Sequence, residues 1–107
     1  MIGRPVIKYT SMDGWLRTFE IHEEFRSIPH GTREALALYL LHGCRPGSFT
    51  TAFLAFDIVQ AYKFADKENV KAMNALMAWM NRYVPAEACG SYERVRRFKG
   101  YVRDEGE

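Results

Sequence analysis

The sequence predicts a mainly α-helical fold, a compact bundle of about four helices around a buried central helix at residues 48–66, with a possible small N-terminal β-hairpin. Three observations lead to this prediction. The 107 residues are 48% hydrophobic and 14% aromatic, which is enough for a core within one domain over residues 1–107. Apolar residues recur at helical spacing through residues 28–103, the expected helical core. Capping residues, prolines and glycines separate the apolar segments.

Residues 1–27 are expected to form an extension or a hairpin ahead of this core. Asp13-Gly14 lies between two β-prone runs within residues 5–21, and Asp-Gly favours the type I′ turn of a hairpin. The alternative is a helix that starts after Ser11 and buries Trp15. We favour the hairpin, which would have to pack on the helices because two strands alone are marginally stable.

The first core helix is expected to start near Pro29, because proline suits the first helical position. Its apolar stripe is Ala35, Leu36, Tyr39 and Leu40. Gly43 then suits the left-handed position that follows a helix end. Pro46-Gly47 matches the central positions of a type II turn, after which Ser48 can cap the next helix.

The central segment 48–66 reads SFTTAFLAFDIVQAYKFAD and is apolar on nearly all sides. A helix of this kind is expected in the interior of a domain. Asp57 is its unusual residue, because a buried carboxylate is costly unless it has a partner. We favour a hydrogen bond to another helix or to a helix N-terminus such as that at Ser91. The alternatives are exposure on a narrow polar seam with Gln60 and Lys63, or a functional contact.

Two further helices are expected after the central one. Asp66 can cap a helix that ends before Pro85, and Ser91 can cap a last helix that extends to about Val102. The first of these carries a stripe of Met73, Met77 and Met80. Methionine-rich surfaces can bind partners, but this spacing favours a place in the core. The tail at residues 104–107 is acidic and is expected to fray.

From Ile28 to about Phe98 the chain resembles a family of small helical proteins encoded by bacteriophages and prophages. The residues that carry the resemblance are Ile28-Pro29, Thr32 to Leu36, Tyr39, Gly43, Gly47 to Phe49, Ala52, Leu54, Asp57, Ala61, Ala65-Asp66, Asn69, Pro85 and Gly90-Ser91. The resemblance implies a mobile genetic element, in a family without a settled biochemical role. Small proteins of this context often bind a host protein, and anti-CRISPR proteins, which inhibit CRISPR effector complexes, are one such class.

The sequence carries no motif of a known catalytic site, so we expect no enzyme activity. It has no glycine-rich phosphate loop, paired-carboxylate motif or Gly-x-Ser-x-Gly elbow. His42-x-Cys44 does not have the spacing of a structural zinc site, and we expect neither a metal nor another cofactor. No apolar run approaches the length of a membrane span and no secretory signal is visible, so a cytoplasmic protein of the host cell is expected.

Together with the absence of catalytic motifs, the resemblance implies a phage-derived inhibitor of host defence, specifically an anti-CRISPR protein that binds a CRISPR effector complex. The expected partner-binding residues are the basic ones of the last helix: Arg94, Arg96, Arg97, Lys99 and Arg103. A solvated outer face is the alternative for these residues. An acidic cluster of Glu20, Glu23 and Glu24 could be a second charged region of the same binding surface or could face the basic one. The alternative function is nucleic-acid binding by the basic helix, because such a helix can contact phosphates.

Overall fold

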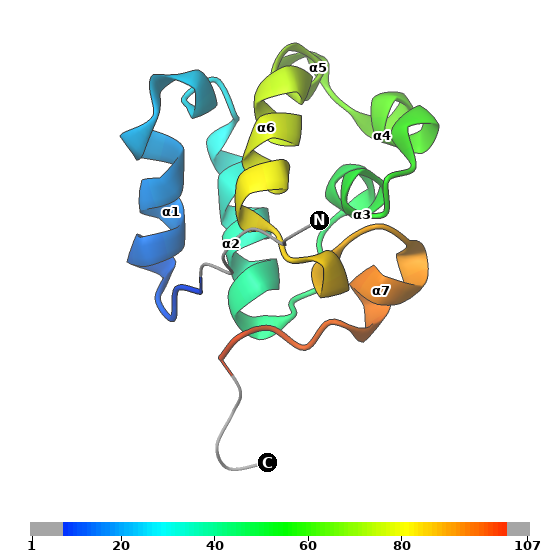
Figure 1. Cartoon of the computed structure of the whole chain (residues 1–107). Helices are drawn as coiled ribbons and strands as arrows, with labels where there is room; N and C mark the ends of the chain where they lie inside the picture. The colour runs from blue at the N-terminus through cyan, green and yellow to red at the C-terminus, as the bar shows by residue number, and fades with distance from the viewer. Residues whose placement is uncertain (1–7, 103–107) are drawn as a thin grey trace, which may run out of the picture.

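The computed structural model describes residues 8–102, and within this range the chain is mainly α-helical with no β-strand (Figure 1). The elements in order are α1 (Met12–Ile21), the 3-10 helix η1 (Glu23–Phe25), α2 (His30–His42), α3 (Ser48–Leu54), α4 (Ile58–Phe64), α5 (Lys67–Lys71), α6 (Met73–Tyr83), the 3-10 helix η2 (Ala86–Ala88) and α7 (Tyr92–Arg97). The long helices α1, α2 and α6 form one side of the molecule, and the short helices α3, α4 and α7 form the other. The predicted mainly α fold is confirmed.

The predicted N-terminal hairpin is wrong for residues 8–21, which contain no strand and form α1 from Met12 to Ile21; residues 5–7 lie outside the described range. Ser11 Oγ accepts a hydrogen bond of 3.1 Å from Gly14 N and so caps the helix. Trp15 and Phe19 lie one turn apart on the face of α1 that meets the core, and both are fully buried. Burial of two large aromatic side chains on one helical face outweighs the turn preference of Asp-Gly.

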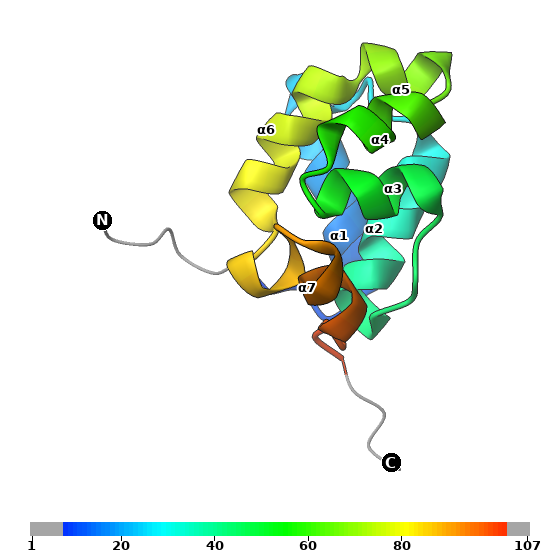
Figure 2. The same ribbon diagram turned by 90° about the vertical axis from the view of Figure 1, so that its right-hand side faces the viewer.

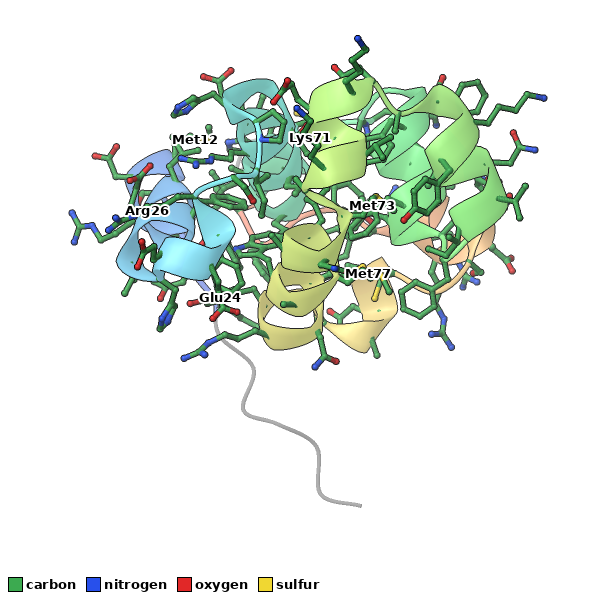
Figure 3. The ribbon with its side chains drawn as sticks, turned by 90° about the horizontal axis from the view of Figure 1, so that it is seen from above. Met12, Glu24, Arg26, Lys71, Met73 and Met77 are labelled. Carbon is green, nitrogen blue, oxygen red and sulfur yellow. The ribbon has the colours of Figure 1, made fainter. Side chains whose placement is uncertain are left out.

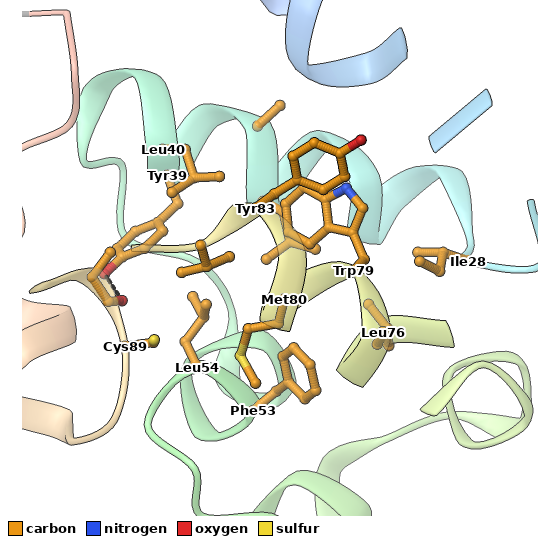
Figure 4. Packing of buried hydrophobic residues seen from close by; sticks show 14 of the residues in the cluster. Ile28, Tyr39, Leu40, Phe53, Leu54, Leu76, Trp79, Met80, Tyr83 and Cys89 are labelled. Carbon is orange, nitrogen blue, oxygen red and sulfur yellow. Dashed lines mark hydrogen bonds between the residues drawn. The ribbon is translucent and has the colours of Figure 1, made fainter. Parts of the chain in front are cut away.

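The core is richest in buried residues along α2 and α6 (Figure 4). Seven of the 13 residues of α2 are buried: Thr32, Arg33, Leu36, Ala37, Tyr39, Leu40 and Leu41. Trp79 of α6 stacks on Phe19 with ring centroids 4.5 Å apart, and its indole N–H donates to Thr18 Oγ1 at 2.8 Å. Tyr39 reaches from α2 to η2, where its hydroxyl donates to the Ala88 carbonyl at 2.7 Å. The interior position predicted for residues 48–66 therefore belongs to α2 and α6.

The predicted central helix 48–66 is wrong as a single buried rod, because it is broken into α3 and α4. The N–H of Asp57 donates to the Ala52 carbonyl at 2.9 Å, and the N–H of Phe56 donates to the Phe53 carbonyl at 3.1 Å. This pair of bonds is a Schellman motif, with Phe56 in the left-handed position at φ +65°. Asp57 then caps α4 by accepting from Gln60 N at 3.3 Å.

The two halves of this segment differ in burial. In α3 the buried residues are Thr50, Ala52, Phe53 and Leu54, whereas in α4 Ala61 alone is buried. A helical break turns the apolar residues of the second half away from the core. The burial predicted from the apolar pattern is therefore confirmed for α3 and wrong for α4.

The remaining helices follow their predicted caps, with different lengths. Asp66 accepts from Asn69 N and starts α5, and α6 follows after a turn at Ala72. Ser91 caps α7, which ends at Arg97 rather than near Val102. Gly47 has φ −70°, so Pro46-Gly47 does not form the expected type II turn. Met73 and Met80 are core residues as predicted, but Met77 is exposed.

The chain after α7 runs across the C-terminal end of α2. The N–H groups of Tyr101 and Val102 donate to the carbonyls of Leu40 and Leu41 at 2.8 and 2.7 Å, and so satisfy acceptors that the end of a helix leaves open. Gly43 ends α2 in the left-handed conformation at φ +69°, as its position predicted. This crossing holds α7 and its basic residues against the helical core.

Candidate partner-binding surface

The basic residues predicted to form one outward face lie in two separate hollows on either side of α7. Arg94, Arg97 and Lys99 line the first hollow, and Arg96 lines the second. Arg103, the fifth predicted residue, lies outside the described residues. A helix of six residues turns neighbouring side chains to different sides, so consecutive arginines cannot share one face.

The first hollow has a volume of about 550 Å³ and lies between η2 and the segment that follows α7. Its charge is reduced by two carboxylates. Glu87 lines the hollow beside the three cations. Arg97 also forms an exposed ion pair with Glu93, with Nη1 and Oε2 3.4 Å apart. Arg94 Nη1 is turned toward the backbone, where the Ala86 and Cys89 carbonyls accept from it at 3.3 and 3.4 Å.

The second hollow carries cations without an acidic lining. It has a volume of about 180 Å³, and Arg45 and Arg96 line it together with Tyr92. A third hollow of about 250 Å³ shares Arg45 and Tyr92 with it and adds Phe64 at the end of α4. Among the residues that the structure describes, no Asp or Glu lines either of these two hollows. We call the four residues Arg45, Phe64, Tyr92 and Arg96 the Tyr92 surface.

An exposed apolar helix borders the Tyr92 surface. Figure 2 shows α4, α3 and α7 one below the other on the side that faces the viewer, with α5 above α4. Val59 on α4 is 76% exposed and Phe56, in the turn before it, is 54% exposed. Ile58, Tyr62 and Phe64 are exposed as well. Contiguous exposed apolar side chains on a small protein mark sites of interaction.

Sequence reasoning missed Arg45, Phe64 and Tyr92 as site residues, because it assigned the whole apolar segment to the core. The signal that could have found the break was Asp57. A carboxylate in an apolar run serves as an N-cap more readily than as a buried helical residue, and a cap at this position requires a new helix start.

Asp57 has the partner that we favoured for it. Its Oδ2 accepts a hydrogen bond from Tyr92 Oη at 2.7 Å, so the carboxylate links the start of α4 to the first residue of α7. The hydrogen bond to the Asp57 carboxylate raises the pKa of the Tyr92 hydroxyl above its usual value. The link fixes Tyr92 between the arginines and α4.

The predicted acidic cluster lies apart from these hollows. Glu20 pairs with the buried Arg33 of α2, and Glu23 and Glu24 belong to η1. Figure 3 shows Glu24 and Arg26 on the opposite side of the molecule from the green α3–α4 segment. Met77 on α6 lies closer to that segment than they do. The acidic and basic regions therefore do not face each other.

Between residues 8 and 102, no three side chains among His, Cys, Asp and Glu are placed to hold a metal ion. Over the same range, no helix has the length and apolar character needed to cross a bilayer. Cys44 is exposed and Cys89 is buried, and neither forms a disulfide.

Comparison of the chain with protein-family models, with curated proteins and with solved structures gives no match in any of the three. The resemblance to the phage-encoded family stays a prediction from the sequence.

Proposed function

We propose that this chain is a phage-derived inhibitor of host defence that acts by binding a protein, specifically a CRISPR effector complex, through the Tyr92 surface. The phage context and the target come from the sequence resemblance. From the sequence we expected a single outward face of basic residues in the last helix. The Tyr92 surface takes its place, and Arg96 is the one residue that belongs to both.

The observation that supports the proposal is the composition of this surface. Arg45 and Arg96 lie beside two exposed aromatic rings, and no acidic side chain of the described residues lines the same hollows. Tyrosine and arginine are enriched among the residues that dominate protein–protein binding energies. Arg45 and Arg96 form no ion pair among the described residues, and the nearby Asp57 carboxylate is bonded to Tyr92. Arginines of this kind beside an apolar helix fit a partner whose surface is apolar with an acidic rim, because complementary charge orients the complex and excludes other partners.

Two neighbouring arginines of α7 provide the test, because they line different hollows. Arg96→Glu should weaken inhibition of a purified CRISPR effector complex by at least about tenfold, in the range of an interface hot spot. Arg97→Glu is the matched control, with the same charge change one residue away, and should inhibit like the parent. Failure of the parent to inhibit any complex in a panel of effector types would contradict the proposed target. Equal inhibition by both variants would contradict the assigned surface.

The second candidate function is nucleic-acid binding, and the first hollow favours it. Three cations converge there next to the rings of Phe98 and Tyr101, which line the same space. Phosphate contacts of this kind supply affinity that falls with salt, because binding releases condensed counterions. Glu87 and the Arg97–Glu93 pair reduce the field, so we place this function second.

The same two variants separate the two functions. Nucleic-acid binding through the first hollow should be weakened by Arg97→Glu and little changed by Arg96→Glu, the reverse of the order expected for protein binding. The measurement is a titration of labelled single-stranded DNA and RNA at several salt concentrations. Binding that does not change with salt, or no binding at low salt, would remove this candidate.

A further inference from the structure

Phe56 occupies a backbone position that ordinarily belongs to glycine. Its φ of +65° is the left-handed conformation of the Schellman motif that ends α3. A side chain in this conformation brings Cβ close to the carbonyl oxygen, and for a bulky residue it is a rare outlier. In the described range Phe56 is the one residue other than glycine with positive φ.

The strained backbone does not lead to burial of the ring. Phe56 is 54% exposed, so its aromatic side chain gains only part of the hydrophobic stabilisation that a core position would supply. Glycine at this position would relieve the strain and would keep both hydrogen bonds of the motif, because they are made by the backbone. Strain that the folded state does not need is a feature of binding and catalytic sites.

The ring lies beside one arginine, one carboxylate and a loop that is tied to α3. A Cβ added to Gly90 would lie 3.8 Å from Phe56 Cε2 and 3.1 Å from Arg94 Nη1, so the ring and this guanidinium flank the same glycine. The neighbouring carboxylate of Asp57 is occupied by Gln60 N and Tyr92 Oη. The N–H of Gly90 donates to the Leu54 carbonyl at 2.8 Å, which ties this loop to the end of α3.

We infer that Phe56 is the anchor residue of the interface, held outward by the strained turn so that its ring inserts into an apolar pocket of the partner protein, with acidic partner groups beside Arg45 and Arg96. Charge complementarity selects this occupant, because Arg45 and Arg96 line the hollows between α3, α4 and α7, where Tyr92 is bonded to Asp57, the residue that follows Phe56. The inference rests on the proposed protein-binding function. It names Phe56 as the residue on which recognition of the partner depends. It also predicts that Phe56 lowers the stability of the free protein.

The test compares variants for stability and for binding. Phe56→Gly should raise the melting temperature, because it removes the left-handed strain, and should weaken binding to the inhibited effector complex by more than about tenfold. Phe56→Leu keeps an apolar side chain and the strain, and should lose less binding with no gain in melting temperature. Ile21→Ala is the matched control, because it truncates an apolar residue of α1 that is as exposed as Phe56 and lies on the other side of the molecule, and it should change binding by less than about threefold.

The outcomes separate the anchor role of Phe56, the strain in its turn and the proposed function. If the parent binds and Phe56→Gly binds equally well, the anchor assignment is overturned while the proposed function stands. If Phe56→Gly does not raise the melting temperature, the strained turn is overturned. If the parent binds no effector complex, the proposed function fails and the anchor assignment fails with it, whereas the melting temperature still decides whether the turn is strained.

Discussion

The hydroxyl of Tyr92 donates a hydrogen bond of 2.7 Å to Oδ2 of Asp57, 35 residues earlier in the chain. The other carboxylate oxygen of Asp57 caps α4. One side chain thus starts α4 and fastens α7 to it, and in doing so sets where the exposed apolar helix lies relative to the arginines.

Removing this carboxylate should therefore affect both the cap and the tyrosine. Asp57→Ala is expected to cost about 1 kcal/mol of unfolding free energy, the usual worth of an N-cap. Asp57→Asn keeps a capping side chain and should cost less. If urea denaturation showed that Asp57→Ala is as stable as the parent, the capping role would be contradicted.

The pKa of Tyr92 gives an independent test of the same bond. Because the bond to Asp57 raises this pKa, the neutral hydroxyl is favoured in the folded protein. The stabilisation is complete below the pKa of an unfolded tyrosine and is lost as pH rises through the higher folded pKa. Asp57→Ala should lower the pKa of Tyr92 in a spectrophotometric titration, with Tyr92→Phe identifying the transition.

Thr18 makes two buried hydrogen bonds, one to α6 and one within α1. Its hydroxyl accepts from the Trp79 indole N–H at 2.8 Å and donates to the Trp15 carbonyl at 2.6 Å. Thr18→Val fills the same volume but leaves the indole N–H without an acceptor, which should cost about 1–3 kcal/mol of unfolding free energy. Thr18→Ser keeps the hydroxyl and is the control. If Thr18→Ser lost as much unfolding free energy as Thr18→Val in urea denaturation, packing and not the hydrogen bond would account for the effect.

Arg33 is 4% exposed and holds three separate parts of the chain. Its guanidinium donates to the carbonyls of Ile28 and Arg26, each at 2.7 Å, and pairs with the Glu20 carboxylate. Arg33→Met should cost about 2–3 kcal/mol, because buried carbonyls lose a charged donor. Arg33→Lys should recover little of this, because an ammonium cannot reproduce the planar fork.

Glu20 is the exposed partner in this pair and should matter less. Glu20→Gln is expected to cost under about 1 kcal/mol, since a solvated carboxylate contributes little. If thermal or urea unfolding showed that Glu20→Gln costs as much as Arg33→Met, the ion pair rather than the carbonyl contacts would dominate.

Gly100 and Gly31 form a matched pair for testing the crossing over α2. A Cβ on Gly100 would lie 2.4 Å from the Leu41 carbonyl oxygen, at φ +89°, whereas one on Gly31 would meet nothing within 4 Å. Gly100→Ala should destabilise the fold by more than about 1 kcal/mol, and Gly31→Ala, inside α2, should stabilise it by up to about 1 kcal/mol. Equal effects in calorimetry would contradict the close approach.

Tyr101 should make the protein sensitive to alkali. Burial, with the charge of Glu87, raises the pKa of Tyr101 to about 12, so its stabilising contribution is full below pH 10 and is lost as pH rises to about 12. Its hydroxyl is also buried without a hydrogen-bond partner in the described part of the chain. Tyr101→Phe should therefore be at least as stable as the parent at pH 8 and should lose less stability between pH 8 and pH 11 in urea titrations.

The sequence by itself determined the mainly helical fold and most helix starts, because caps and breaks are local. Asp66 and Ser91 accept hydrogen bonds from N–H groups three residues later, and Gly43 needs only its own backbone freedom. The core roles of Met73 and Met80 also followed from their spacing.

Only the tertiary structure decided which apolar residues are buried. Residues 48–66 read as one interior helix, yet Phe56 turns the chain and leaves Val59 and Phe64 exposed, a choice that depends on Tyr92 and Gly90 from a distant segment. The arginines of α7 likewise divided between two hollows because η2 and Arg45 lie on opposite sides of the helix. Burial of any apolar side chain is favourable, because it removes apolar surface from water. Which apolar side chains are buried depends on which other segments of the chain pack against them.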